Sequence, residues 1–132
     1  MIEPIYVVDT NALAWYLIES ARLSARAKML FVAAENAQTR LYFSAISLAE
    51  LYYADQKWGW FNDFKATYND IQSAPYLRAV AFHENVVLDF DRDQAIPEMH
   101  DRIIVGLART LRAPLITSDV VIRQSGIVQV EW

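Results

Sequence analysis

The stretch Ile5-Tyr6-Val7-Val8-Asp9-Thr10-Asn11 carries the main indication of the fold. Its apolar, mostly β-branched start is typical of a buried parallel strand. Thr10-Asn11 follows as a turn and helix cap, and residues 12–18 are predicted to be helical. A second apolar run, Leu115-Ile116-Thr117-Ser118, also leads into an aspartate, Asp119. Two buried strands that each end at a carboxylate predict a parallel α/β fold with a polar site at one sheet edge.

Outside these two stretches, short apolar runs alternate with helical patterns. Ser24 is a plausible helix cap, and Ser47 with Glu50 three residues later fits the capping-box pattern. Such alternation predicts a mostly parallel central sheet that is covered on both faces. We expect helices at 25–37, 47–57, 61–73 and 101–111, a helical turn at 120–122, strands at 41–43, 79–82, 115–117 and 127–130, and a loop at 91–94. Residues 85–90 fit either a helix or a strand, and a helix is preferred.

Composition limits the class of protein. The 132 residues, 55% of them hydrophobic, are enough for one packed domain over 1–132. The absence of cysteine excludes disulfides and zinc–thiolate sites and fits a cytoplasmic protein. No signal peptide or membrane span is predicted. A net charge of −4 argues against broad electrostatic binding of nucleic acid, but it is compatible with a nuclease whose acids are neutralised by metal ions and with a basic protein partner.

Four acids lie beside or inside apolar segments. Asp9 and Asp119 follow strands, whereas Glu50 and Asp101 are expected in the first turns of helices, where the helix dipole favours an anion. Ligands of open α/β sheets bind beyond the carboxyl ends of the strands, so all four can meet there. Isolated buried carboxylates are costly unless they are paired or bind a metal. Their oxygen ligands suit Mg²⁺ or Mn²⁺, and the pattern predicts a divalent-cation site.

Each of these acids also has a purely structural interpretation. Asp9 can cap the helix that begins near Asn11, and Glu50 can serve only as a capping-box acid. Asp101 can be a simple charge at a helix N-terminus, and Asp119 an ordinary turn residue. The occurrence of all four at comparable places favours the functional interpretation over these alternatives.

Other residues remain open between structural and functional roles. Thr117 is equally consistent with both. Arg102 and Arg112 are the best-placed basic candidates for phosphate contact. The aromatic-rich segment 52–68 fits core packing, a partner groove or base stacking. His83 and His100 are expected to be structural or incidental, and Asp91, Asp93 and Glu98 to belong to a solvated loop.

Four short segments together carry a resemblance to a known family. They look like the four acidic motifs of PIN-domain nucleases, and over nearly its whole length the chain resembles the VapC-type toxins of toxin–antitoxin pairs. The segments are Val8-Asp9-Thr10-Asn11, Ser47-Leu48-Ala49-Glu50-Leu51, His100-Asp101-Arg102-Ile103-Ile104 and Leu115-Ile116-Thr117-Ser118-Asp119.

The resemblance implies a PIN-like three-layer α/β/α sandwich and metal-dependent cleavage of single-stranded RNA that leaves a 5′-phosphate and a 3′-hydroxyl. It also implies a homodimer held inactive by a small antitoxin. Asp9, Glu50, Asp101 and Asp119 would form the acidic site, with Thr10, Asn11 and Thr117 as polar support. The chain departs from some relatives in having no second acid shortly after Asp119, which puts a second metal ion in doubt.

Rival functions fit the sequence less well. A phosphate-receiver domain needs a lysine near the last strand, and the lysines here are Lys28, Lys57 and Lys65. A haloacid-dehalogenase-type phosphatase needs Asp-x-Asp, but Asn11 stands at the third position. We therefore predict a Mg²⁺- or Mn²⁺-dependent endoribonuclease toxin. The alternatives are an inactive PIN-fold interaction module and a housekeeping PIN-type nuclease.

Overall fold

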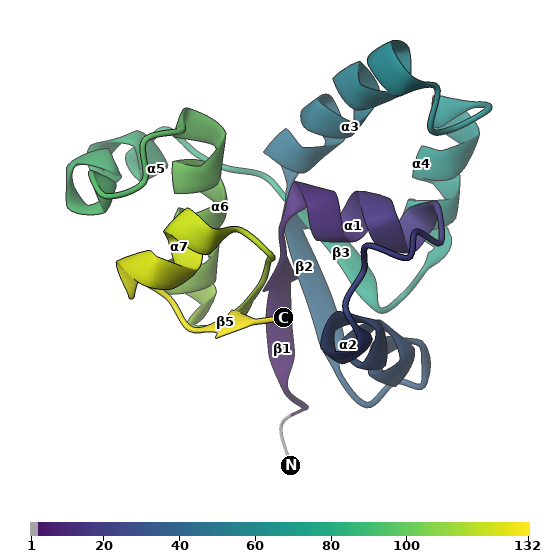
Figure 1. The fold of residues 1–132 in the computed structure, drawn as a ribbon, viewed down its shortest axis with the longest axis horizontal. Helices are drawn as coiled ribbons and strands as arrows, with labels where there is room; N and C mark the ends of the chain where they lie inside the picture. Colours follow the sequence, from purple (N-terminus) through teal and green to yellow (C-terminus); the bar gives the residue numbers. More distant parts are fainter. Residues whose placement is uncertain (1–2) are drawn as a thin grey trace.

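The computed structural model describes residues 3–132, and these form a sheet of five parallel strands in the order β3-β2-β1-β4-β5 (Figure 1). The chain builds outward from the central strand β1 to β3 and then crosses back to β4 on the other side of β1. The boundary between β1 and β4 is therefore the topological switch point, where open α/β sheets bind ligands. The strands are β1 (Ile5–Val8), β2 (Arg40–Ser44), β3 (Leu77–Val80), β4 (Leu115–Ile116) and β5 (Val130–Glu131).

Helices cover both faces of the sheet, which confirms the predicted three-layer α/β/α arrangement (Figure 1). Helices α1 to α4 pack on one face, and α6 and α7 pack on the other. No helix within residues 3–132 has the length and apolar character needed to cross a membrane. The helices are α1 (Thr10–Leu17), α2 (Ala25–Glu35), α3 (Ala45–Trp58), α4 (Phe64–Ser73), α5 (Asn85–Leu88), the 3-10 helix η1 (Phe90–Asp93), α6 (Met99–Leu111) and α7 (Val120–Ser125).

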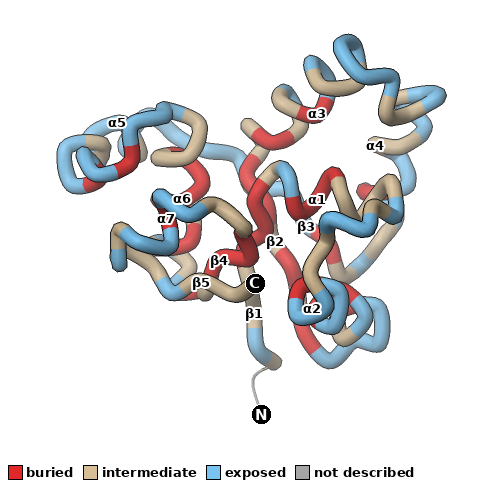
Figure 2. Tube along the Cα trace, in the orientation of Figure 1, coloured by how far each residue is buried: buried red, intermediate tan, exposed pale blue. Residues whose placement is uncertain are grey.

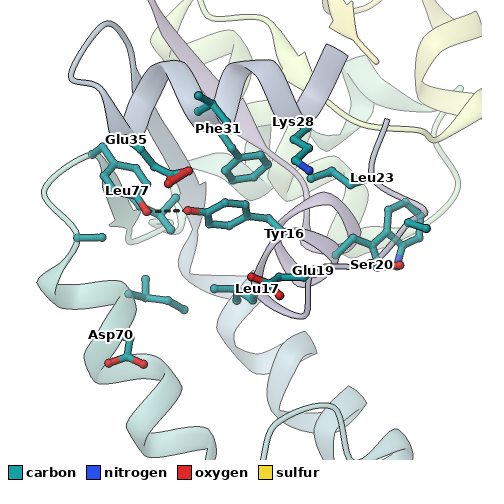
Figure 3. A pocket seen from close by; sticks show the side chains of 16 residues that line it. Tyr16, Leu17, Glu19, Ser20, Leu23, Lys28, Phe31, Glu35, Asp70 and Leu77 are labelled. Atoms are coloured by element: carbon teal, nitrogen blue, oxygen red, sulfur yellow. Dashed lines mark hydrogen bonds between the residues drawn. The ribbon is translucent and has the colours of Figure 1, made fainter. Parts of the chain in front are cut away.

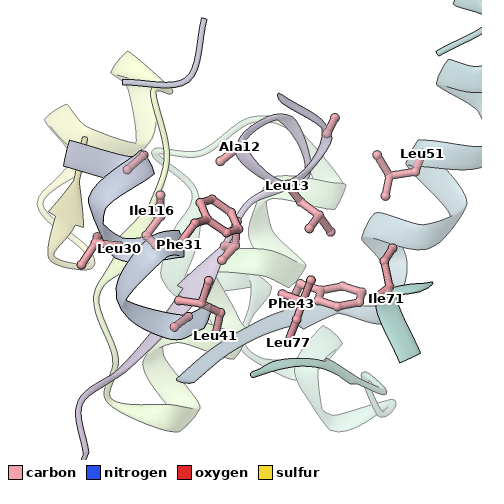
Figure 4. Close-up of a cluster of buried hydrophobic side chains, with 14 residues drawn as sticks. Ala12, Leu13, Leu30, Phe31, Leu41, Phe43, Leu51, Ile71, Leu77 and Ile116 are labelled. Atoms are coloured by element: carbon pink, nitrogen blue, oxygen red, sulfur yellow. The ribbon is translucent and has the colours of Figure 1, made fainter. Parts of the chain in front are cut away.

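The central strands are buried on both sides, as the continuous apolar runs predict. Successive residues of a strand point to opposite faces, so Val7 packs with the α6–α7 cluster and Val8 with the α1–α4 cluster. Leu115 and Ile116 divide in the same way. Figure 2 shows this buried centre and the exposed outer helices, and Figure 4 shows the larger cluster. Each such side chain stabilises the fold by about 2 kcal/mol through burial.

The start of α3 differs from the prediction. Ser44, not Ser47, caps this helix, and its side chain accepts a hydrogen bond from the backbone N–H of Ile46. Ser47 is therefore buried inside the helix, and Glu50 lies in the second turn. The capping-box interpretation of Glu50 and its expected place in the first turn are both wrong. The pattern places a cap within a few residues, but it does not distinguish two serines three positions apart.

Other boundaries also differ from the prediction, and several helices begin directly after an acidic cap. Asp9 caps α1, which begins at Thr10, and Asp63 caps α4, which begins at Phe64 instead of residue 61. Glu98 caps α6, which begins at Met99, two residues before Asp101. Among the strands, β3 lies at Leu77–Val80 instead of 79–82, β4 stops at Ile116, and β5 is Val130–Glu131 instead of 127–130. Among the helices, α2 ends at Glu35 and α7 continues to Ser125. The predicted 91–94 loop is partly the 3-10 helix η1.

Candidate active site

A pocket of about 300 Å³ lies at the carboxyl edge of the sheet, at the switch point between β1 and β4. Asp9, Glu50, Asp101 and Asp119 all line it, so the fold brings together the four acids that the sequence singled out. They come from four separate parts of the chain: the ends of β1 and β4, the second turn of α3 and the first turn of α6. The remaining lining residues are Thr10, Asn11, Ile104, Ser118, Val120 and Val121.

Asp9 is both a helix cap and a wall of this pocket. Its Oδ1 accepts a hydrogen bond from the backbone N–H of Ala12 at 2.8 Å, and its Oδ2 accepts one from the hydroxyl of Thr117. Burial raises the pKa of Asp9 to about 6, although these two hydrogen bonds act against the increase. The charges of Asp119 and Glu50 raise it further. The cap position therefore does not exclude a functional role for Asp9, because the same carboxylate lines the pocket.

Thr117 connects the two aspartates that follow strands. While its hydroxyl donates to Asp9, its Oγ1 accepts from the backbone N–H of Asp119 at 3.0 Å. Asp119 in turn caps α7, with Oδ1 accepting from the backbone N–H of Ile122 at 3.0 Å. Thr117 is 1% exposed, so this small network is held rigidly at the end of β4. The supporting place predicted for Thr117 agrees with this geometry.

Thr10 holds Glu50 toward the pocket. Its hydroxyl lies 2.6 Å from Oε1 of Glu50 and 2.8 Å from Oγ of Ser47. A hydroxyl has one proton, and the carboxylate is the stronger acceptor, so Thr10 donates to Glu50. This bridge joins the first residue of α1 to the second turn of α3. Asn11, the other predicted supporting residue, is exposed and lines the same pocket.

Asp101 carries a strong electrostatic perturbation at this site. Partial burial raises the pKa of Asp101 to about 7, and the charges of Glu98, Asp119, Glu50 and Asp9 contribute in that order. Its backbone N–H donates to Oε2 of Glu98 at 2.9 Å. Raised pKa values in a cleft are typical of functional carboxylates.

His100 and Glu98 form a rim beside Asp101 that the sequence analysis missed. Nδ1 of His100 lies 3.0 Å from Oε1 of Glu98 and 3.5 Å from Oε2 of Glu50. Glu98 was expected in a solvated loop, and it instead caps α6. The Glu98-to-Asp101 spacing, an acid three residues before an apolar helix, was the signal for that cap.

Neither predicted phosphate-binding arginine lies in the pocket. Nε of Arg102 donates to the backbone carbonyl of Ile96 at 2.6 Å, and Arg112 is the C-cap of α6, at the opposite end from Asp101. Within residues 3–132, no lysine or arginine lines this pocket. The site thus concentrates negative charge without a nearby compensating cation.

The donors fit a hard divalent cation. Carboxylate oxygens are the preferred ligands of Mg²⁺ and Mn²⁺. Burial is the main cause of the raised pKa values of Asp9 and Asp101, and a bound cation would offset both this burial cost and the smaller repulsion from neighbouring acids. Among residues 3–132, no three acidic or histidine side chains already surround one point. Mg²⁺ does not require such a cage, because it usually keeps several waters and binds through one or two carboxylates.

The chain is similar to known proteins in both sequence pattern and fold. The family model described as PIN domain matches residues 6–126. Similar solved structures include VapC20 from Mycobacterium tuberculosis, described as a sarcin-ricin loop cleaving toxin (TM-score 0.71, 17% identity, 96% of this chain and 99% of that chain covered). VapBC2 from Rickettsia felis, bound to a promoter DNA fragment, gives a TM-score of 0.67 at 19% identity, covering 96% of each chain.

A toxin–antitoxin complex from Klebsiella pneumoniae gives a TM-score of 0.58 at 20% identity, with 86% of each chain covered. Identities this low establish likeness of fold. Among curated proteins, no sequence matches this chain.

Proposed function

The chain belongs to the PIN-domain family, and on this premise we propose that it is a metal-dependent endoribonuclease that acts as the toxin of a toxin–antitoxin pair. The observation that carries the proposal is the meeting of Asp9, Glu50, Asp101 and Asp119 in one pocket at the switch point of the sheet. Charged groups of one sign are costly to bring together, so their convergence indicates a ligand of opposite charge.

The proposed chemistry is hydrolysis of an RNA phosphodiester. The four acids would hold Mg²⁺ or Mn²⁺, which would supply charge neutralisation at the phosphate and a water of lowered pKa. The same carboxylates could also orient the attacking water or accept its proton, which is a second role that acids at such a site can have. Thr117 orients Asp9, and Thr10 orients Glu50, through hydrogen bonds. Because both carboxylates are already oriented, less side-chain entropy would be lost in reaching the reactive geometry.

The proposed partner is a small antitoxin protein. Several chains with this fold are described as toxins or as members of toxin–antitoxin complexes, which supports the proposal for this chain. The acidic pocket suits a basic side chain of the partner, which would compete with the metal ion for the same carboxylates. The proposal also includes a cytoplasmic homodimer, for which exposed apolar side chains such as Tyr53 and Leu88 offer contact area.

A cleavage assay with a matched pair of variants tests the enzyme. Purified protein should degrade single-stranded RNA with Mg²⁺ or Mn²⁺, lose that activity in excess chelator, and regain it when metal is restored. Asp9→Asn should abolish cleavage, whereas Asp91→Asn, at an exposed acid outside the pocket, should not. Undiminished cleavage in chelator would contradict the metal-dependent mechanism.

Expression in a bacterial host tests the toxin role. The parent chain should arrest growth, Asp9→Asn should relieve the arrest, and co-purification from the native host should recover a small bound protein. RNA cleavage without growth arrest or partner would favour a housekeeping nuclease. A folded chain that binds a partner but cleaves no RNA would favour an inactive interaction module.

A further inference from the structure

Two tryptophans from opposite ends of the chain form a pair on the surface. Trp15 lies in the second half of α1, and Trp132 directly follows β5. Their ring centroids are 5.8 Å apart, with an angle of 55° between the planes. Both residues are only partly buried, and Trp132 packs against the α1–α4 cluster. The two rings are therefore held in place by the fold while part of their surface stays open to solvent.

Neither tryptophan lines the acidic pocket, but two routes through the structure connect the pair to residues of the pocket or to their hydrogen-bond partners. On α1, Asn11 lines the pocket, and Trp15 is one turn further along the same helix face. At the sheet edge, the backbone N–H of Thr117 donates to the carbonyl of Glu131 at 3.2 Å, and Trp132 is the next residue. Thr117 is itself bonded to Asp9. Trp15 is thus one helical turn from Asn11, and Trp132 follows the residue that is hydrogen-bonded to Thr117.

Basic side chains lie on the other side of the pair. Arg22, Arg26 and Lys28 fall within seven residues around the start of α2, and all three are exposed. Nε of Arg26 lies 3.1 Å from Oε2 of Glu131, the residue before Trp132. Lys28 and Trp15 line one hollow of about 790 Å³ between α1, α2 and α4, and Figure 3 places Lys28 near Leu23. The acids Glu19, Glu35 and Asp70 also line this hollow, so the basic contacts are limited to the start of α2.

The tryptophan pair and the basic residues can supply RNA contacts that the acidic pocket lacks. RNA is a polyanion, and with no lysine or arginine among the described lining residues the pocket would attract a phosphate only through its bound metal ion. Contacts outside the pocket must then supply the rest of the affinity. Aromatic rings bind any base through its π-face, and nearby cations bind the backbone, which is the usual construction of a single-strand binding surface.

We propose that Trp15 and Trp132 form a base-stacking subsite for the single-stranded RNA that enters the acidic pocket, with Arg22, Arg26 and Lys28 contacting its phosphates. This inference rests on the proposed ribonuclease function. A nucleotide adjoining the scissile phosphate stacks on the pair, while the scissile phosphate itself occupies the acidic pocket. Because stacking tolerates any base, the subsite adds affinity without fixing a sequence.

Binding measurements in a cleavage-deficient background test the subsite directly. Asp101→Asn protein is titrated into a fluorescein-labelled single-stranded RNA hexamer, and fluorescence anisotropy gives the dissociation constant. Adding Trp132→Leu should weaken binding roughly 5- to 100-fold, the range expected for loss of one stacked base. Trp132→Phe should fall between, since a smaller ring still stacks. Trp58→Leu is the matched control: Trp58 is 62% exposed at the end of α3, and its removal should leave binding unchanged.

An abasic substitution separates stacking from damage to the fold. Hexamers that lack a single base are titrated in turn, and one of them should lose the same affinity as Trp132→Leu causes. With that hexamer, Trp132→Leu should cause no further loss, because the base and ring form one interaction. In the active enzyme, Trp132→Leu should raise KM for short RNA by a similar factor and change kcat little.

Three results would overturn the subsite. They are unchanged binding and KM in folded Trp132→Leu protein, a binding loss for Trp58→Leu in its place, or loss of capture of a small partner protein with unchanged RNA binding. The last would assign the pair to a protein interface. Absence of RNA cleavage by the parent chain would overturn the proposed function as well, so the two failures are distinguishable.

Discussion

Two buried aspartates of this chain differ in the charges that surround them: Asp93 has a cationic partner, whereas Asp9, in the candidate site, has acidic neighbours. Asp93, in η1, is 1% exposed, and its Oδ1 accepts a hydrogen bond from Nη2 of Arg109. Asp9, after β1, is 8% exposed, and it has hydrogen bonds to Thr117 and Ala12 but further acids as its charged neighbours. Burial alone does not tell them apart. The sign of the surrounding charge does.

The difference also has a structural side. The Asp93–Arg109 pair ties η1 to α6, so it stabilises the segment between β3 and α6. Nη1 of Arg109 is buried and has no hydrogen-bond partner within the described residues 3–132, so the pair is incompletely satisfied. Asp9 instead lies at the switch point and keeps its uncompensated charge where a ligand can neutralise it. Asp93 stabilises the fold through its ion pair with Arg109, whereas ionised Asp9 lowers the stability because it is buried among other acids.

The largest expected effect is on activity at Asp9. Asp9→Asn should lower RNA cleavage by roughly a thousandfold or more, a loss of about 4 kcal/mol in transition-state stabilisation. The variant should fold normally, since the Asn Oδ1 can accept from the backbone N–H of Ala12 as Asp9 does. Steady-state cleavage rates and circular dichroism check both parts. Cleavage at the parental rate would remove Asp9 from the site.

Asp93 should show the opposite pattern. Asp93→Asn leaves the charge of Arg109 buried without a counter-ion, so the free energy of unfolding should fall by about 3 to 5 kcal/mol. Cleavage per folded molecule should be retained at low temperature. The control is the double variant Asp93→Leu with Arg109→Met, which removes both charges and should recover most of the stability. Urea unfolding measures all three, and an equally unstable double variant would contradict the ion-pair explanation.

The pH dependence of stability should next show what it costs to ionise the buried acids of the pocket. The ordinary pKa of 3.8 is raised to about 6 for Asp9 and to about 7 for Asp101 in the folded state. Between these values and 3.8, the folded chain binds more protons than the unfolded chain, so unfolding free energy falls as pH rises from about 4 to about 7. For Asp9 the loss is on the order of 3 kcal/mol.

Urea unfolding in chelator checks this from pH 4 to pH 8. Asp9→Asn should match the parent near pH 4 and become the more stable protein toward pH 7, because it lacks the group that must ionise while buried. Parallel curves for parent and variant would show that Asp9 does not ionise at a cost. Added Mg²⁺ should reduce the difference by stabilising the folded parent.

The smallest effect is expected at Asp91, which is exposed in the same 3-10 helix as Asp93. Asp91→Asn should change the unfolding free energy by less than about 0.5 kcal/mol and leave cleavage unchanged, as is usual for surface substitutions. The same two assays apply. A large effect on either would show that proximity to Asp93 matters more than burial and pairing.

Much of the site was predictable because its signals are local. An apolar run followed by Asp9 or Asp119, and an acid at the start of the helix containing Asp101, are visible without knowing the fold. The parallel sheet followed from the same alternation, and parallel strands place their carboxyl ends at one edge. That is why four acids far apart in sequence were correctly expected to share a pocket.

Less could be predicted where two equivalent groups compete. Ser44 and Ser47 can each cap α3, and the packing of α1 on α3, which brings Thr10 to Ser47 and Glu50, leaves the capping position to Ser44. Asp93 and Asp91 look alike in the sequence, and only the position of Arg109 one helix later makes one of them buried.

The sequence by itself therefore determined the alternation of strands and helices and the acids at their ends, because hydrophobic period and chain order are properties of neighbouring residues. Only the tertiary structure decided which distant groups meet: Thr117 with Asp9, Arg109 with Asp93, and Trp15 with Trp132. Such contacts depend on strand order and helix packing. Many side chains compete for each partner, and the geometry of the sheet selects among them.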